Sequence, residues 1–360
     1  MAPFVPARLT LARHRRGLTK GALAARAGLS SKSISMYEGG ATDPEPETIS
    51  LLAKHLDFPV EFFLRPDPPV IDERKASFRS LRSMTAAQRN MVLAAGSIAI
   101  ELDQWIDKQF KRPAPTIPDL RSTTPEGAAE ALRAEWGLGY KRIQNIVHLL
   151  ELHGARVYSL VHDSREVDAF SLWWGDQPFI FLNTMKSAEH SRFDAAHELA
   201  HLVLHHHGGV SGREAESEAD KFASAFLMPK RDVIARGPRW PSPKSVIQAK
   251  HYWGVSAMAL VYRLHTVGML TDHYYNQLCI RLRMQYGSSE PEEMPRESSQ
   301  ALAKVLTALR RDGTSRREVA RGIGVYPREI RDLLFGLVLQ PVAGGSPKAP
   351  PSQTPKLSLM

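Results

Sequence analysis

The chain has few features of a secreted or membrane-bound protein. It contains 360 residues but a single cysteine, Cys279, so an internal disulfide is excluded and a reducing cytoplasm is expected. The longest apolar run, residues 91–100, is too short to cross a bilayer and contains a glycine. Residues 1–16 lack an apolar core of signal-peptide length. We therefore expect a soluble cytoplasmic protein that has no membrane partner.

Acidic residues are absent from the first 37 positions, whereas lysine and arginine together occur there seven times. The whole chain also carries a formal net charge of +9. Positive charge concentrated in one segment favours a polyanionic partner such as nucleic acid. The same segment has the residue spacing of short helices, at residues 9–14, 19–27, 30–38 and 47–56. Gly28 lies in the turn between the second and the third, as in a helix-turn-helix unit whose second helix enters the major groove.

Residues 8–64 resemble the XRE family of lambda repressor-like DNA-binding domains. The residues that carry the resemblance are Arg15, Arg16, Gly17, Leu18, Thr19, Leu23, Ala24, Gly28, Leu29, Ser30, Ile34, Ser35, Tyr37, Glu38, Gly39, Pro44, Leu52 and Ala53. The resemblance implies binding to double-stranded operator DNA. A small helical bundle used for protein contact or dimerisation is the alternative interpretation.

Two groups of residues in this segment are the candidates for DNA contact. Exposed positions on the third helix are expected to face base edges, namely Ser31, Lys32, Ser33, Ser35 and Met36. Basic residues on the first two helices are expected to position the phosphate backbone, namely Arg13, Arg16 and Lys20. Lys20 stands where the family often carries glutamine, which keeps a phosphate contact but changes its chemistry.

His197, Glu198 and His201 form the H-E-x-x-H pattern of zinc-dependent peptidases. Residues four apart lie on one face of an α-helix, so both histidines can bind the same Zn²⁺ ion. Glu198 then lies beside the open coordination position, where it can take a proton from water and pass it to a leaving amine. Two ordinary histidines on a helix are the alternative, because a five-residue pattern also occurs by chance.

A second predicted helix supplies the third protein ligand that a catalytic zinc site needs. Glu216 is the candidate for that ligand, and Asp220, four residues later, is expected to hold a ligand histidine by its other ring nitrogen. Glu218 is the competing choice for the third ligand. His207 has the offset of the third histidine in metzincins, but that pattern needs a glycine where this chain has a leucine.

Residues 192–205 and 216–229 together resemble the ImmA/IrrE family of metallopeptidases. The family pattern implies zinc ligands at His197, His201 and Glu216. It implies Glu198 as the general acid and base. It also implies an extended strand before the zinc helix, for which residues 178–183 are the candidate, and this strand is expected to pair with the substrate.

Members of this family cut helix-turn-helix repressors, so the resemblance implies a partner repressor as the substrate. Cleavage of the chain itself, near residues 66–69, is a variant of that hypothesis. The sequence does not identify the residue that polarises the scissile carbonyl, for which His251, Tyr252 and Tyr262 are candidates.

We predict an α+β fold that is mainly helical, with an N-terminal all-α helix-turn-helix domain and a zincin-like metallopeptidase domain containing a small antiparallel sheet. Short strands are expected at residues 155–161, 167–174 and 179–182, and a helical stretch at 243–265. The predicted divisions are a DNA-binding domain at 1–66, a helical linker region at 67–124, a peptidase domain at 125–290, a C-terminal helical region at 291–340 that also scans as helix-turn-helix, and a disordered tail at 341–360.

Three classes of function fit these features. The first is a DNA-binding regulator with a zinc endopeptidase domain that cleaves a partner. The second is a transcription regulator or antitoxin whose zinc site is structural or sensory, and the third is a helical adaptor. The expected partners are operator DNA and a repressor or toxin-like protein, and the sequence leaves a homodimer open.

Overall fold

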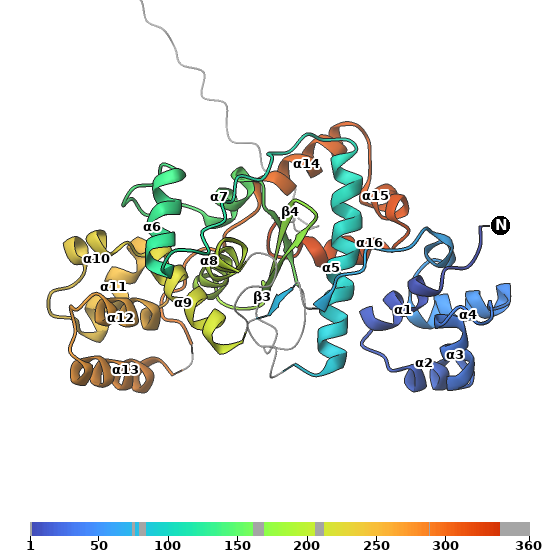
Figure 1. Ribbon diagram of the computed structural model, residues 1–360, viewed down its shortest axis with the longest axis horizontal. Coiled ribbons are helices and arrows are strands. Elements are labelled where there is room, and N and C mark those ends of the chain that lie inside the picture. The colour runs from blue at the N-terminus through green and yellow to red at the C-terminus, as the bar shows by residue number, and fades with distance from the viewer. Residues whose placement is uncertain are drawn as a thin grey trace, which may run out of the picture.

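The structure, a computed structural model, describes residues 2–73, 76–78, 84–160, 169–205, 212–287 and 289–338. In this part of the chain, α-helices surround one four-stranded sheet (Figure 1). The predicted α+β, mainly helical fold class is confirmed. His207 and the predicted tail lie outside the described residues. The described helices include none with the length and hydrophobicity that spanning a membrane requires.

The N-terminal segment folds into four α-helices and a 3-10 turn. These elements are α1 (Pro6–Arg15), α2 (Lys20–Ala27), α3 (Ser31–Glu38), α4 (Pro46–Leu56) and η1 (Val60–Leu64). The Thr19 and Ser30 hydroxyls cap α2 and α3 by accepting from backbone N–H groups. Gly28 has a φ of +64°, which a residue with a side chain rarely adopts, and it allows the tight turn between these helices. The four predicted helices are therefore confirmed.

The sheet contains β1 (Ser77–Phe78), β2 (Arg156–Ser159), β3 (Ala169–Trp174) and β4 (Gln177–Leu182), in the order β1-β3-β4-β2. β3 and β4 form an antiparallel hairpin and β1 is antiparallel to β3, but β2 runs parallel to β4. The prediction of an antiparallel sheet is wrong for β2. The reason is the chain path, because the hairpin places β4 beside β2, and β4 returns in the direction of β2.

Helices cover both faces of the sheet. On one face lies α5 (Ala86–Asp107), at the position of the helix predicted within the linker region (Figure 1). Gly96 lets it approach closely, since a Cβ there would lie 2.7 Å from Ile71 and 3.2 Å from the Phe170 ring. On the other face lies α8 (Ala188–Leu204), which carries the H-E-x-x-H motif. The segment between the two predicted domains is therefore part of the core of the sheet-containing body.

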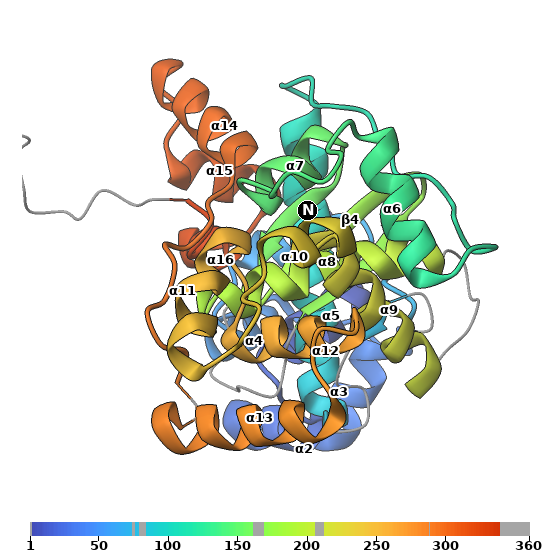
Figure 2. The same ribbon diagram turned by 90° about the vertical axis from the view of Figure 1, so that its left-hand side faces the viewer.

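Further helices enclose α8. α6 (Pro125–Glu135) and α7 (Ile146–Leu152) precede the sheet, and α9 (Arg213–Leu227) packs directly on α8. A helical layer follows, made of α10 (Lys230–Arg236), α11 (Pro243–Trp253), α12 (Ala257–Thr266) and α13 (Asp272–Tyr286), which Figure 2 shows in front. The helical stretch predicted at residues 243–265 is present as two helices, because Gly254 adopts a φ of +65° and ends α11. Cys279 is buried on α13, as expected for a core residue.

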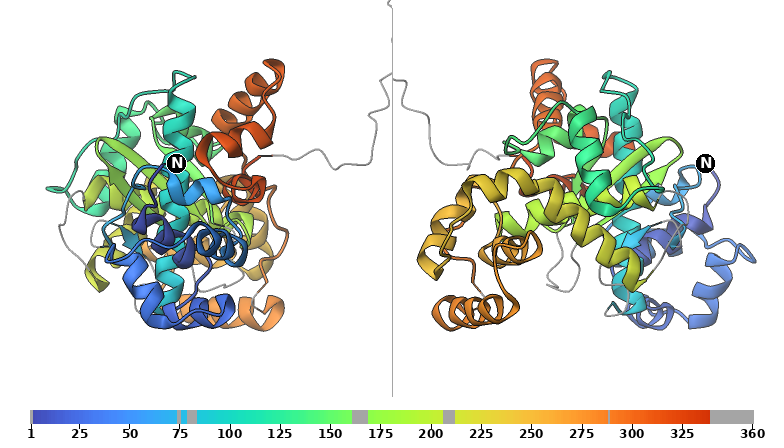
Figure 3. Two further views of the ribbon diagram at one scale, coloured as in Figure 1. Left: turned by 90° about the vertical axis from the view of Figure 1, so that its right-hand side faces the viewer. Right: turned by 60° about the vertical axis from the view of Figure 1, so that its left-hand side comes forward.

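The C-terminal region contains α14 (Gln300–Arg311), α15 (Arg316–Ile323) and α16 (Pro327–Leu334). Ile330, Leu333 and Leu334 of α16 are buried, and this helix contacts β2 and α5. Figure 3 (left) views the molecule from the side of α1–α4 and shows these orange and red helices beside them.

Candidate metal centre

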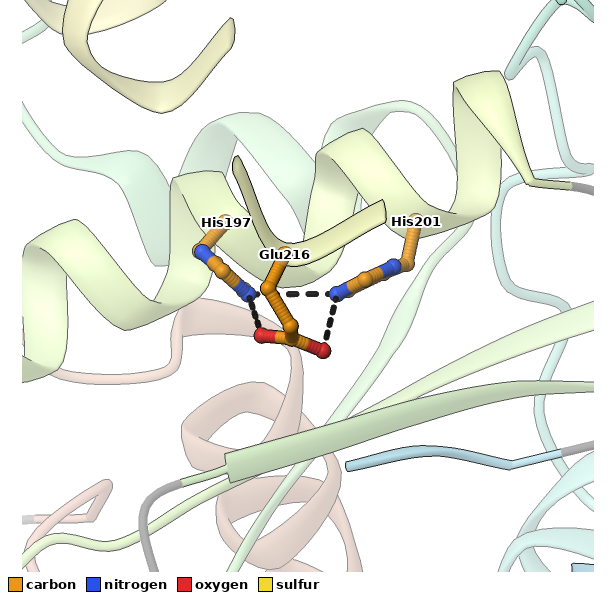
Figure 4. Close-up of side chains that lie close together, drawn as sticks. All are labelled: His197, His201 and Glu216. Atoms are coloured by element: carbon orange, nitrogen blue, oxygen red, sulfur yellow. Dashed lines mark hydrogen bonds and ion pairs between the residues drawn. The ribbon is translucent and has the colours of Figure 1, made fainter. Parts of the chain in front are cut away.

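Two histidines on α8 and one carboxylate on α9 form a compact group of possible metal ligands. The Nε2 atoms of His197 and His201 lie 3.1 Å apart, and both imidazoles point to the same side of α8 (Figure 4). Glu216 Oε2 lies 3.2 Å from Nε2 of His197, and Glu216 Oε1 lies 3.6 Å from Nε2 of His201. One donor atom from each residue lies within 4.8 Å of the others, so the three side chains can contact one ion.

The packing of α8 against α9 explains why these groups meet. Between the two histidines, Leu199 and Ala200 are fully buried and fix the rotation of α8. On α9, Ala219, Phe222 and Ala223 are fully buried in the same core. Glu216 lies one turn before this apolar stretch, in the first turn of α9. Its carboxylate therefore reaches the histidines at the end of α9 while its side chain stays 28% exposed.

Asp220 contacts His197 at Nδ1, the ring nitrogen that does not face Glu216. Its Oδ1 lies 2.9 Å from Nδ1 of His197, so the imidazole can donate there, and Nε2, on the side of Glu216, is the ring atom that can bind a metal ion. Burial lowers the pKa of His197, but the hydrogen bonds to Asp220 and Glu216 outweigh burial and raise this pKa to about 9. The predicted second carboxylate therefore lies where it can fix the tautomer of a ligand histidine.

Glu198 is fully buried, and its two carboxylate oxygens have different surroundings. Oε2 accepts hydrogen bonds from the hydroxyls of Ser77 and Ser171, each at 2.7 Å. Oε1 has no hydrogen-bond partner among the described residues, although it is buried. Burial raises the pKa of Glu198 to about 7. A buried carboxylate held through one oxygen, with the other unpartnered, suits a group that exchanges a proton with a reactant.

Both serines were missing from the sequence interpretation. Ser171 had a signal, because it is a small polar residue between Phe170 and Leu172 in an otherwise apolar strand. Side chains alternate along a strand, so Ser171 faces α8 while its apolar neighbours face α5. Nothing in the local sequence distinguishes Ser77, which becomes visible only when β1 pairs with β3.

The competing carboxylate, Glu218, points elsewhere. Its Oε2 lies 3.0 Å from Nε2 of His205, and Nδ1 of His205 lies 2.9 Å from Nδ1 of His201. Glu218 thus supports His201 through His205, much as Asp220 supports His197. This places Glu216, and not Glu218, against both Nε2 atoms.

The candidates for carbonyl polarisation have other surroundings. His251 Nε2 lies 2.9 Å from Glu292 Oε2, and the Tyr252 ring packs edge-on against Trp253. Tyr262 is 38% exposed on α12. None of these contacts directs a group toward the histidines of α8.

A zinc ion fits this group of residues. Two neutral imidazoles and one carboxylate are one of the sets that catalytic zinc uses, with a further position left for water. The unpartnered Oε1 of Glu198 is the orphaned buried atom expected beside such a position. The arrangement can therefore hold a metal, orient a water molecule and move a proton.

Residues 150–265 match the IrrE N-terminal-like domain of the M78 peptidase family, and residues 7–61 match a helix-turn-helix domain. The chain joins a helix-turn-helix domain to an IrrE-like domain. Both resemblances expected from the motifs are confirmed. The matched part of the IrrE-like domain runs from α7 to α12 and contains His197, Glu198, His201 and Glu216. No curated protein matches the chain.

The helix-turn-helix domain presents α3 to solvent. Ser31, Lys32 and Ser35 are exposed, while Ser33 and Met36 are partly exposed. Ile34 is the buried residue of α3 and packs it onto the domain. The helix that is expected to enter the major groove is therefore free to do so.

Two of the three residues predicted to contact phosphates have partners within the protein. Arg13 is buried and donates to both carboxylate oxygens of Glu38, at 2.6 and 2.9 Å. Arg16 donates to the carbonyls of Leu56 and Asp57, at 2.6 and 2.8 Å. It also pairs with the side-chain carboxylate of Glu329 on α16. Both guanidiniums, near the C-terminal end of α1, therefore have hydrogen-bond and ion-pair partners within the protein. Lys20 Nζ lies 3.5 Å from Oε2 of the same Glu38, but the Lys20 side chain is 44% exposed.

Proposed function

We propose that this protein is a DNA-binding transcriptional regulator whose IrrE-like domain is a zinc-dependent endopeptidase. Its substrate would be a partner repressor or regulator. The observation that carries the proposal is the convergence of His197, His201 and Glu216 beside the unpartnered Oε1 of Glu198. The helix-turn-helix domain supports DNA binding, through the exposed face of α3.

The proposed ligands are Nε2 of His197, Nε2 of His201 and the carboxylate of Glu216. Zinc bound there would polarise a peptide carbonyl and lower the pKa of water at the open position toward about 7. Glu198 would orient that water through Oε1, accept its proton and deliver the proton to the leaving amide nitrogen. Ser171 on β3 donates to Oε2 and Oε1 has no hydrogen-bond partner among the described residues, so Oε1 is the oxygen proposed to contact that water.

Asp220 would act as a positioning residue. Its hydrogen bond to Nδ1 keeps His197 in the tautomer whose Nε2 carries a lone pair. His205 and Glu218 would have a comparable but weaker effect on His201, because they act through an additional side chain.

The test separates zinc binding from cleavage. Glu198→Gln should keep stoichiometric zinc but lose cleavage of the partner repressor, because an amide cannot accept the proton. His201→Ala and Glu216→Ala should lose both zinc and cleavage. Zinc content per chain and the cleavage products, both measured by mass spectrometry, distinguish these outcomes.

Glu218→Gln is the matched control, since it changes a carboxylate on the same helix without changing a proposed ligand. It should keep zinc and at least most of the activity. Loss of zinc in Glu218→Gln together with retention in Glu216→Ala would assign the third ligand to Glu218.

A second function is a non-proteolytic regulator with a structural or sensory zinc site. The contact of Ser77 with Glu198 favours it, because a strand of the chain itself lies against the proposed proton acceptor. If wild type and Glu198→Gln bind zinc equally and regulate the same operon identically, the site is structural.

A further inference from the structure

The sheet has one edge beside the candidate metal centre, and the chain itself occupies that edge. We propose that residues 76–78 form an internal blocking strand, which covers the edge of β3 where an extended substrate segment would pair. This inference rests on the proposed peptidase function. It assigns the substrate class as an unfolded or extended polypeptide that adds to β3 as a strand.

The strand order decides which edge is available. β4 pairs with β3 along its whole length and with β2 from Phe179 to Leu182, so it is an interior strand of the sheet. The prediction that residues 178–183 pair with substrate is therefore wrong, because an interior strand has no free edge. β3 and β4 both contact α8, but Ser171 on β3 is the residue of these two strands that donates to Glu198, and β3 is the one nearer a sheet edge. A peptide that reaches Glu198 by adding to the sheet must lie along β3.

β1 takes this position. Its register places Ser77 opposite Ser171 and Phe78 opposite Phe170, in antiparallel pairing. Figure 1 shows β1 as the short blue arrow beside β3. β1 precedes α5 in the chain and lies outside the segment that matches the IrrE-like domain. It is thus an added strand on the sheet of that domain.

The Ser77 hydroxyl fixes β1 against the proposed catalytic residues. It accepts from the backbone N–H of Ser171 at 3.1 Å, donates to Glu198 Oε2 at 2.7 Å, and lies 2.8 Å from the Ser171 hydroxyl. A substrate strand would need the same N–H group and the same approach to Glu198. Substrate and β1 therefore exclude one another.

The covalent connection of β1 to the rest of the chain makes this block effective, and its short pairing with β3 makes the block reversible. β1 is joined to the helix-turn-helix domain on one side and to α5 on the other, so its local concentration at the edge is high. Pairing through two residues is nevertheless short, and a longer strand from a protein partner can replace it. Arg8 in α1 holds the Pro66 carbonyl at 2.6 and 2.8 Å, which connects the start of the linker to the DNA-binding domain.

The experiment uses the full-length, zinc-loaded protein and the variant Ser77→Pro. Proline removes both the hydroxyl and a strand N–H group, so β1 should leave the edge. Val70→Pro is the matched control, because Val70 is an exposed linker residue outside β1 that already follows a proline. The probe is reduced, carboxymethylated casein, which is an extended polypeptide.

Three readings are taken for each protein. Hydrogen exchange at the Ser171 amide should be at least about tenfold faster in Ser77→Pro than in wild type, because its acceptor is lost. Casein should bind Ser77→Pro about tenfold more tightly in fluorescence anisotropy, and its cleavage should rise by a similar factor. Val70→Pro should match wild type in all three readings.

The outcomes separate this inference from the proposed function. Tighter casein binding without any cleavage supports the blocking strand and contradicts the peptidase. Faster exchange at Ser171 without tighter binding, or unchanged exchange, overturns the blocking strand even if wild type cleaves casein. Cleavage of the wild-type chain within residues 76–78 would also overturn it, because β1 would then be a substrate.

Discussion

Two units of the chain share the pattern of helix, glycine turn and helix, but their second helices have opposite surroundings. In the first, Gly28 joins α2 to α3 with a φ of +64°; in the second, Gly324 joins α15 to α16 with a φ of +73°. Thr19 and Ser315 cap the first helix of each unit. The local physics is therefore the same in both units.

The two units differ in how much of their second helix is buried. α3 buries Ile34 and leaves Ser31, Lys32 and Ser35 on an exposed face. α16 instead buries an apolar face together with a carboxylate, Glu329. Glycine turns and caps set the shape of such a unit, but only the contacts of its second helix decide whether it can enter a groove. The C-terminal unit, which also scans as helix-turn-helix, packs its second helix into the protein.

The second unit forms ion pairs that dock the helix-turn-helix domain onto α16. Glu329 accepts from Arg15 at 2.8 Å and from Arg16 at 2.7 Å, and only 2% of its side chain is exposed. Arg328 on the same helix pairs with Asp57, but this pair is largely exposed. The second helix of the first unit, α3, is thus exposed for DNA contact, while α16 of the second unit holds the first domain in place.

The largest expected effect comes from removing the ion pairs of Glu329 with Arg15 and Arg16. Glu329→Gln removes the only charge that Arg15 and Arg16 share across the contact, and it leaves two partly buried guanidiniums without that carboxylate. Removal of one partner of a buried pair costs a few kcal/mol, so we expect the docking of α1–α4 to weaken by about 2 to 3 kcal/mol. Hydrogen exchange of the amides of α1 in the full-length protein measures this loss.

Arg328→Ala is the matched control. The side chains of Arg328 and Asp57 are 39% and 46% exposed, so their pair should contribute less than about 1 kcal/mol. Equal exchange in the two variants would mean that the contacts of α1 with α5, including the Arg8–Glu101 ion pair, hold the domain rather than the charge of Glu329.

This comparison also shows what the sequence could and could not predict. The spacing of His197 and His201, the Glu216–Asp220 offset and the glycine turn at Gly28 depend on residues close in sequence, and the structure places them as expected. The pairing of Ser77 with Glu198 spans 121 positions, and that of Arg16 with Glu329 spans 313. No local pattern links the two members of such a pair.

Arg13 illustrates the same limit. A basic residue in a basic segment suggests a phosphate contact, but Glu38 at the end of α3 takes this charge, 25 positions away. The sign of the charge was readable from the sequence, whereas its partner was not. Likewise, the three strands were expected, but their order and the added β1 depend on long-range pairing.

A second prediction compares the exposed faces of α3 and α16 directly. Lys32→Glu should weaken operator binding about tenfold or more, because it replaces an attraction to DNA by repulsion at a position expected to face the groove. Arg331→Glu makes the same charge change on α16, where the side chain is 56% exposed, and should change binding less than about twofold. Electrophoretic mobility shifts with the full-length protein measure both. Equal losses in the two variants would show that α16 also contacts DNA.

A third prediction concerns pH. Burial raises the pKa of Glu329, but Arg15 and Arg16 outweigh burial and lower it below the ordinary value of 4.5. A carboxyl with a lowered pKa in the folded protein stabilises it above the unfolded value, and this contribution is lost as pH falls through the folded value. The difference in exchange between wild type and Glu329→Gln should therefore be constant above pH 5 and shrink below about pH 4. A difference that persists unchanged to pH 3 would contradict ionisation as its cause.

The smallest expected effect separates surface charges from internal ones within the helix-turn-helix domain. Each phosphate contact contributes about 0.9 to the slope of log binding constant against log salt concentration. Lys20→Gln should lower that slope by about 0.9, since this side chain is 44% exposed and lies at the start of α2. Arg16→Gln should leave the slope unchanged, because its guanidinium already binds two carbonyls and Glu329. The titrations use folded protein, checked by the exchange of α1, so that lost stability is not mistaken for a lost contact. A lower slope in Arg16→Gln alone would mean that Arg16 leaves Glu329 when DNA binds, and that docking and DNA binding compete for one side chain.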